Sequence, residues 1–238
     1  MSRSIFQEAG LTLQRMVWSK RAASWDEMSN PGLDRVVAEL ISMVGDRPEA
    51  TAIDLGCGSG QLSIPLAAHV KEVFAVDIAP KMVELLEEKL DRQGVTNVKA
   101  LVGSVQELGV GPSSVELVCS NYVLHHLSDR EKAAFVSDAF SWLIPGGEII
   151  FGDMMFGRGA TAEDRAVIAE KIKTLLGKGL GGWWRIAKNG VRYLFRIQEK
   201  PISLSAWVEL LKKAGFVEIA TTRIVAEAGI ITAKKPLQ

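Results

Sequence analysis

Two aspartates and a run of glycines carry the clearest chemical pattern in the chain. Asp54 lies in a short apolar segment, residues 52–55, and a glycine-rich loop with the sequence Gly-Cys-Gly-Ser-Gly follows at residues 56–60. Glycines let a backbone approach a ligand closely, because no Cβ stands in the way. Asp77 directly follows a second apolar segment, residues 73–76. A carboxylate there can accept hydrogen bonds from both hydroxyls of a ribose, so the pattern predicts an adenosine-containing ligand.

The spacing of the glycines argues against a dinucleotide. A dinucleotide fingerprint has glycine at its first, third and sixth positions, whereas the sixth position here is Gln61 and the third glycine is Gly60. Asp54 would also place a carboxylate close to where a pyrophosphate should lie. Because a carboxylate repels a diphosphate and attracts an ammonium group, the loop disfavours NAD.

Side chains that could accept a proton come late in the chain; they are His125, His126, Asp153 and Tyr193. An imidazole titrates near neutrality and can take a proton from a hydroxyl, a thiol or an activated carbon acid. The alternative is that one histidine caps the loop before Ser128 and the other packs. Both interpretations stay open from the sequence.

These residues need a sheet to bring them together, and the segments alternate as a parallel sheet requires. The apolar segments are near-continuous Val, Ile and Phe runs, which indicates burial on both faces. We predict strands at residues 52–55, 73–76, 98–102, 115–120, 148–152, 216–225 and 229–233. We predict helices at residues 33–45, 62–70, 80–92, 129–143 and 205–214, with a tight turn at residues 145–147.

Composition places the chain among ordinary globular proteins. It has 238 residues, 47% of them hydrophobic, and a formal net charge of zero, so the total charge makes no case for nucleic acid or membrane. The two cysteines, Cys57 and Cys119, show no C-x-x-C spacing, and we expect neither a disulfide framework nor a metal site. No apolar run is long enough to span a bilayer and no signal peptide is apparent, so a cytoplasmic protein is expected.

Residues 154–202 interrupt the alternation and have an unusual composition. Seven basic residues and no acidic one fall within residues 171–198, with aromatic residues between them. One interpretation is a lid that binds an anionic or aromatic acceptor, and a second is a membrane-surface patch suited to a lipid-like acceptor. The third is a solvated basic face with its aromatic residues in the core. RNA binding ranks below these, because nothing resembles an RNA-binding module.

Several segments together resemble the class I S-adenosylmethionine-dependent methyltransferases, with the nearest likeness to the small-molecule branch that includes ubiquinone and menaquinone methyltransferases. The resemblance covers residues 20–155 well and residues 203–235 more loosely. The matching segments are residues 52–60 (the first motif), 75–79 (the acidic ribose-binding turn), 121–127 (after the fourth strand), 143–147 (before the fifth) and 22–26 (an upstream motif with Trp25 where tyrosine is frequent).

The resemblance implies an α/β fold: a Rossmann-like, doubly wound, seven-stranded sheet, mostly parallel with one antiparallel strand. Residues 1–238 would form a single methyltransferase domain. From their position in the chain, and not from the resemblance, we expect residues 1–30, which include Trp18, to form an N-terminal cap over the cofactor. The lid interpretation of residues 154–202 makes them a helical lid insertion. The resemblance also implies S-adenosylmethionine as the cofactor, a small-molecule acceptor and transferase activity. A protein that binds the cofactor without transferring its methyl group is the alternative; the oligomeric state stays open.

The resemblance also implies roles for single residues. Asp54 and the loop backbone would hold the methionine part of the cofactor, Asp77 the ribose, and Ile78 and Met82 the adenine. Serine at position 104 is a departure, because the family often has an acidic residue there that faces the adenine amino group. Asn121 would lie at the mouth of the acceptor pocket. The predicted cofactor-binding residues are Trp25, Asp54, Gly56, Cys57, Gly58, Gly60, Gln61, Asp77, Ile78, Met82, Ser104, Val105 and Asn121.

Overall fold

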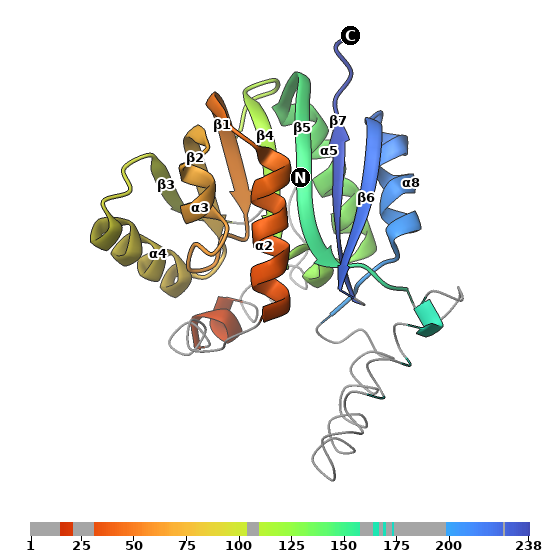
Figure 1. The fold of residues 1–238 in the computed structure, drawn as a ribbon, viewed down its shortest axis with the longest axis horizontal. Helices are drawn as coiled ribbons and strands as arrows, with labels where there is room; N and C mark the ends of the chain where they lie inside the picture. Colours follow the sequence, from red (N-terminus) through yellow and green to blue (C-terminus); the bar gives the residue numbers. More distant parts are fainter. Residues whose placement is uncertain are drawn as a thin grey trace, which may run out of the picture.

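Buried apolar segments form a seven-stranded sheet with the order β3-β2-β1-β4-β5-β7-β6 (Figure 1). The computed structural model describes residues 15–20, 31–103, 110–157, 164–166, 169, 173, 199–225 and 227–238. The strands are β1 (Arg47–Leu55), β2 (Val70–Asp77), β3 (Val98–Val102), β4 (Val115–Asn121), β5 (Leu143–Met154), β6 (Val217–Val225) and β7 (Ala228–Lys234).

The pairing of the strands confirms the predicted fold. Strands β1 to β5 pair in parallel, while β7 runs antiparallel to both of its neighbours, β5 and β6. The chain order of the strands reverses where β1 lies beside β4. Ligands of open α/β sheets bind outside the carboxyl ends of the strands at such a switch point.

Helices cover both faces of this sheet (Figure 1). Leu40, Leu66 and Leu86 bring α2 (Pro31–Val44), α3 (Ser63–Ala67) and α4 (Pro80–Gln93) into one buried cluster. Phe135 and Trp207 bring α5 (Asp129–Trp142) and α8 (Leu204–Ala214) into a second cluster on the opposite face. The sheet is therefore buried on both sides, as its apolar sequence requires.

Local signals set several helix ends where the sequence predicts them. Helix α4 begins with Pro80 in its first turn and ends at Gly94, whose φ of +68° is left-handed. Helix α5 begins with a capping box, in which Ser128 and Glu131 each accept a backbone N–H from the other. Both helices lie within one residue of their predicted bounds. The loop before each helix therefore also ends at the predicted residue.

Several elements differ from their predicted bounds. Strand β1 begins at Arg47, five residues before the predicted strand, and β2 begins at Val70, three residues before its own. The helix expected at residues 62–70 is only the five-residue α3, because β2 already begins at Val70. The turn expected at residues 145–147 is a register irregularity inside β5. Backbone pairing with Lys235, which is distant in sequence, extends the strand through this segment. Gly146 N–H donates to Lys235 O at 3.0 Å, and Lys235 N–H donates to Gly147 O at 2.8 Å.

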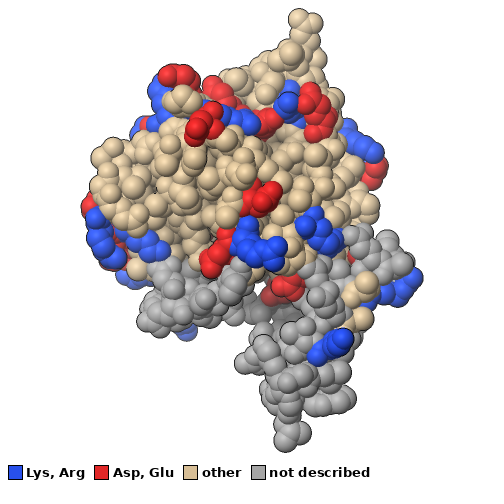
Figure 2. All heavy atoms as spheres, viewed as in Figure 1, with Lys and Arg blue, Asp and Glu red and all other residues tan. Residues whose placement is uncertain are grey.

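The predicted insertion, residues 154–202, lies largely outside the described residues. On the face drawn in Figure 2, acidic and basic side chains of the described chain are intermixed. No helix in the described part of the chain is long and apolar enough to cross a membrane. Within the same residues, no group of three or more histidine, cysteine, aspartate or glutamate side chains is placed to hold a metal ion.

Candidate active site

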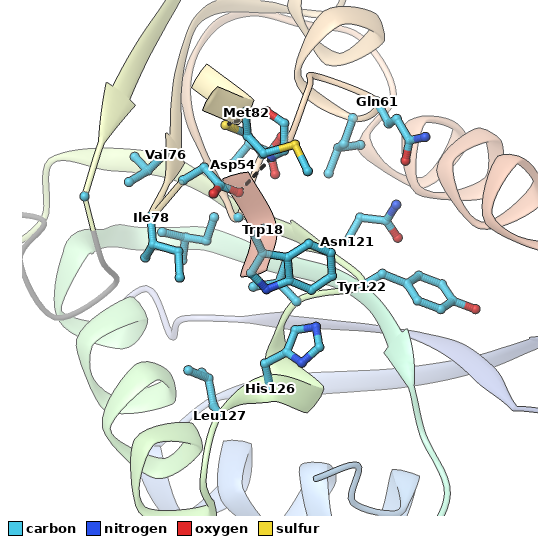
Figure 3. Close-up of a pocket in the computed structure, with 18 of the residues that line it drawn as sticks. Trp18, Asp54, Gln61, Val76, Ile78, Met82, Asn121, Tyr122, His126 and Leu127 are labelled. Atoms are coloured by element: carbon cyan, nitrogen blue, oxygen red, sulfur yellow. Dashed lines mark hydrogen bonds between the residues drawn. The ribbon is translucent and has the colours of Figure 1, made fainter. Parts of the chain in front are cut away.

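A cleft opens at the carboxyl ends of β1, β2 and β4, at the point where the strand order reverses (Figure 3). It contains about 1040 Å³ of empty space, including its open mouth. Of the residues predicted to bind a cofactor, the lining includes Asp54, Gly56, Cys57, Gly58, Gln61, Asp77, Ile78, Met82 and Asn121.

The glycine-rich loop has a backbone that other residues could not easily adopt. Gly56 and Gly58 have φ angles of +72° and +53°, in the left-handed region. A Cβ on Gly56 would lie 2.2 Å from a methyl of Val123, whereas a Cβ on Gly58 would meet nothing within 4 Å. Gly56 N–H donates to Val76 O at 2.7 Å, and Gly58 N–H donates to Asp77 Oδ2 at 3.0 Å. The loop is thus anchored to β2, and its second glycine orients the ribose-binding candidate.

The other loop residues have separate roles. Cys57 is 5% exposed, and burial raises the pKa of its thiol well above the usual value, which disfavours the thiolate that a nucleophile needs. Gln61 lines the cleft. Gly60 does not, because it packs against α4: a Cβ there would lie 2.5 Å from Leu86 Cδ1. The structure therefore places Gly60 as a packing residue of the loop.

Asp54 is the most unusual carboxylate of the cleft. It is 1% exposed; its Oδ2 accepts a hydrogen bond from Ser63 Oγ at 2.5 Å. Its Oδ1 is buried with no hydrogen-bond partner among the described residues. Burial raises the pKa of Asp54 to about 7; the Ser63 bond lowers it and the charge of Asp77 raises it further. A buried carboxylate oxygen without a partner, on a residue that lines a cleft, is suited to a cationic ligand group.

Asp77 is held in place by backbone donors from both sides. Its Oδ2 accepts Gly58 N–H at 3.0 Å, and its Oδ1 accepts Ala79 N–H at 2.8 Å. Burial raises the pKa of Asp77, and these backbone bonds partly offset the rise. Each carboxylate oxygen can accept a second hydrogen bond, so the side chain keeps acceptor capacity on the cleft.

An apolar side of the cleft lies next to Asp77. Ile78 and Met82 line it, and Met82 packs in a cluster with Ala79 and Trp18. Trp18, on the helix of residues 15–20, crosses the middle of the view in Figure 3. Among the predicted cofactor-binding residues, Trp25, Ser104 and Val105 lie outside the described residues.

The opposite side of the cleft carries polar and aromatic groups. Asn121 ends β4, and its Oδ1 is buried with no hydrogen-bond partner among the described residues. Tyr122 follows with a left-handed φ of +55°, and burial raises the pKa of its phenol to about 12. A non-glycine residue in this conformation is strained, and such strain concentrates at functional sites. His126 also lines the cleft, with its ring edge-on to Trp18 at 5.1 Å.

His125 and Asp153 do not line the cleft. His125 is 4% exposed and Asp153 is 1% exposed, and His125 Nδ1 lies 2.5 Å from Asp153 Oδ1. His125 belongs to the same turn as His126, but its ring is buried against Asp153, so the placement of these two residues does not support the prediction that either takes a proton from an acceptor directly. Of the four predicted proton acceptors, His126 lines the cleft, and Tyr193 lies outside the described residues.

The residues present fit S-adenosylmethionine better than a dinucleotide. The unpartnered Asp54 Oδ1 suits its ammonium group, Asp77 its ribose, and the apolar pair Ile78 and Met82 its adenine. The described lining contains two carboxylates and no lysine or arginine. A diphosphate would therefore meet repulsion without a compensating cation.

Comparison with known proteins agrees with this chemistry. Residues 52–147 match a family model described as a methyltransferase domain. An uncharacterized methyltransferase of Bacillus velezensis is 28% identical over 148 residues, which are 62% of this chain and 63% of that protein. Phosphoethanolamine N-methyltransferase 1 of Zea mays is 28% identical over 146 residues, 61% of this chain and 28% of that protein. The chain thus matches less than two thirds of the length of these relatives.

Solved structures show the same fold. The YcgJ protein of Bacillus subtilis superposes with a TM-score of 0.63 at 17% identity, over 84% of this chain and 98% of that one. The family match covers the glycine-rich loop, Asp77 and the segment after β4, which together form the cleft. Over residues 52–147 the chain is therefore similar to methyltransferase domains, and it shares the fold of this solved structure.

Proposed function

We propose that this chain transfers the methyl group of S-adenosylmethionine to a small-molecule acceptor that enters the cleft beside Asn121 and His126. One observation carries the proposal: two buried oxygens without hydrogen-bond partners among the described residues, Asp54 Oδ1 and Asn121 Oδ1, belong to residues that line the same cleft. Buried polar atoms in proteins nearly always have partners, so a ligand is the natural source of the missing donors.

We propose that each part of the cofactor is bound by a different group of cleft residues. Asp54 and the loop backbone would bind the methionine part, Asp77 would accept the ribose hydroxyls, and Ile78 and Met82 would pack on the adenine. When bound, the cofactor supplies a methyl group already activated by the positive charge on sulfur. The roles of Trp25, Ser104 and Val105 remain predictions.

For methyl transfer from a sulfonium, the protein needs few catalytic groups beyond those that bind the cofactor and the acceptor. Alignment of the acceptor can lower much of the barrier, and a base is required only when the acceptor atom still carries a proton. His126 is the described imidazole that lines the cleft, and we propose it as the proton acceptor for such substrates.

The acceptor class is the open part of the proposal. An amine is one class to test, because phosphoethanolamine N-methyltransferases are among the relatives. A quinone-like acceptor, as in the ubiquinone and menaquinone methyltransferases, is another. The basic and aromatic composition of residues 171–198 suits either an anionic group on the acceptor or a membrane surface.

Two measurements test the proposal in sequence. Calorimetric titration with S-adenosylmethionine and S-adenosylhomocysteine first establishes binding, and NAD serves as the negative control. Incubation with methyl-labelled S-adenosylmethionine and pools of amines, phenols, thiols and quinols then detects label transfer together with S-adenosylhomocysteine. Binding without transfer to any pool would favour the alternative of a cofactor-binding protein. Absence of binding to either ligand would contradict the proposal.

A further inference from the structure

The buried carboxylate of Asp153 forms hydrogen bonds to the turn that carries His126. This turn is the short helix η2 (Leu124–His126). Asp153 Oδ1 lies 2.5 Å from His125 Nδ1, and Asp153 Oδ2 accepts the backbone N–H of His125 at 2.8 Å. Asp153 Oδ1 also accepts the N–H of Met154 at 2.6 Å. A single side chain at the end of β5 thus fixes both the ring and the backbone of His125.

Two further contacts fix the same turn from other elements. The N–H of Lys200, in the segment before α8, donates to His125 O at 2.6 Å. Lys132 of α5 is 0% exposed; its Nζ donates to Leu127 O, and also to Lys200 O at 2.7 Å. The turn and Leu127, the residue that follows it, are therefore bound by β5, α5 and the chain that leads into α8. Such a turn has little freedom to move relative to the sheet.

Ring contacts extend this restraint to the cleft. The ring centroids of His125 and His126 are 4.0 Å apart, with an angle of 49° between the planes. Tyr122 meets His125 edge-on at 6.2 Å, and Trp18 meets His126 edge-on at 5.1 Å. Figure 3 shows the ring of His126 beside that of Trp18 in the cleft. His126 is thus packed between a fixed ring behind it and an aromatic ring in front.

We infer that Asp153 and His125 form a positioning pair for His126. Asp153 holds His125 with its proton on Nδ1, because a carboxylate accepts and a neutral imidazole has one N–H to donate. His125, fixed in this way, holds the ring of His126 toward the acceptor side of the cleft. The consequence for methyl transfer rests on the proposed function, in which His126 takes a proton. The ionisable side chains near the pair are Tyr122 after β4, His126 in the same turn and Lys132 from α5.

The chain offers a direct spectroscopic test, because it has only three histidines, His69, His125 and His126. Long-range ¹H–¹⁵N NMR spectra of the labelled full chain show which ring nitrogen carries the proton, and single substitutions assign each ring. We expect neutral His125 to carry its proton on Nδ1. Asp153→Asn has one acceptor oxygen in place of two, so it should weaken this preference and shift the ring signals of His126 as well.

Conservative and disruptive variants of His125 separate positioning from simple packing. His125→Asn keeps an N–H donor close to where Nδ1 was, although it removes the ring, so its His126 signals should differ from wild type less than those of His125→Leu. His125→Leu keeps apolar bulk but has no donor, and it should shift or broaden those signals. If Asp153→Asn does not fold, the comparison of these two variants decides the question.

A second histidine–aspartate pair provides the matched control. His69 Nδ1 lies 2.7 Å from Asp46 Oδ1, near the start of β1 and at the opposite end of the sheet from the cleft. Asp46→Asn should leave the His126 signals unchanged. The inference is overturned if neutral His125 carries its proton on Nε2. It is also overturned if His126 is unmoved in both Asp153→Asn and His125→Leu while only the melting temperature falls. Titration of the wild-type sample with S-adenosylmethionine tests the proposed function separately, since the proton on His125 is read without any ligand.

Discussion

Ser63 Oγ donates a hydrogen bond to Asp54 Oδ2 at 2.5 Å, while the other oxygen of the same carboxylate is buried without a partner among the described residues. Ser63 is the first residue of α3, and Asp54 lies near the end of β1. The bond therefore orients the carboxylate between strand and helix and leaves Oδ1 for a ligand. This arrangement makes Asp54 the residue whose ionisation links folding stability to cofactor affinity.

Asp54→Asn should make the ligand-free protein more stable above neutral pH. Burial raises the pKa of Asp54 from 3.8 to about 7. Between those values the unfolded chain has lost this proton and the folded chain keeps it, so the free energy of unfolding falls as pH rises. Asparagine is uncharged throughout and removes this loss. We expect a gain on the order of 2–4 kcal/mol at pH 8 and almost none at pH 4, measured by urea unfolding. Equal pH dependence in both proteins would contradict the assignment.

Cofactor affinity of the wild-type chain should follow the opposite trend. An ammonium group prefers the ionised carboxylate, so affinity for S-adenosylmethionine should rise as pH increases through about 7, the value to which burial raises the pKa of Asp54. In Asp54→Asn the affinity should be lower and nearly independent of pH. Calorimetry from pH 6 to pH 8 in buffers of different ionisation enthalpy would also count the proton released. Wild-type affinity that stays flat over this range is the contrary result.

Asp77→Ala should weaken binding of S-adenosylmethionine by roughly 1–3 kcal/mol, because charge-assisted hydrogen bonds to the ribose are lost. The substitution also removes the acceptor of Gly58 N–H, so part of the loss comes from a less ordered loop. Asp77→Asn separates the two effects, since its amide oxygen can still accept the Gly58 N–H. Unchanged affinity in the alanine variant would refute the ribose assignment.

Gly56→Ala and Gly58→Ala form a matched pair, because both positions have a left-handed φ and only one is crowded. At Gly56 the new methyl would lie 2.2 Å from Val123, and at Gly58 it would meet nothing within 4 Å. Backbone strain alone costs about 1–2 kcal/mol, and overpacking adds roughly 1–3 kcal/mol. Gly56→Ala should therefore lower the free energy of unfolding more than Gly58→Ala does. Equal losses would show that Val123 moves aside.

His126→Ala should leave the affinity for S-adenosylmethionine nearly unchanged, because no predicted cofactor contact involves this ring. Its effect should appear only with an acceptor that must lose a proton. Calorimetry with the cofactor alone tests the first part. A large loss of affinity there would mean that His126 supports the cofactor rather than the acceptor.

The sequence predicted which residues of β1, β2 and the glycine-rich loop lie together at the cleft, because their signals are local. Asp54, the glycine loop and Asp77 each follow a recognisable strand, and the carboxyl ends of β1 and β2 are neighbours in any sheet of this order. The acceptor side was harder. Whether His125 or His126 faces the cleft depends on Asp153, 28 residues along the chain. The length of β5 likewise depends on pairing with Lys235, which no pattern near Gly146 signals.

The central claim is that the cleft binds a sulfonium nucleoside through the unpaired oxygen of Asp54. Its most direct test is a calorimetric comparison of S-adenosylmethionine and NAD on wild-type and Asp54→Asn protein at pH 8. We predict that the wild-type chain binds S-adenosylmethionine and not NAD, and that Asp54→Asn loses affinity while gaining thermal stability. Equal affinity for S-adenosylmethionine in both proteins, or tighter binding of NAD, would contradict the account.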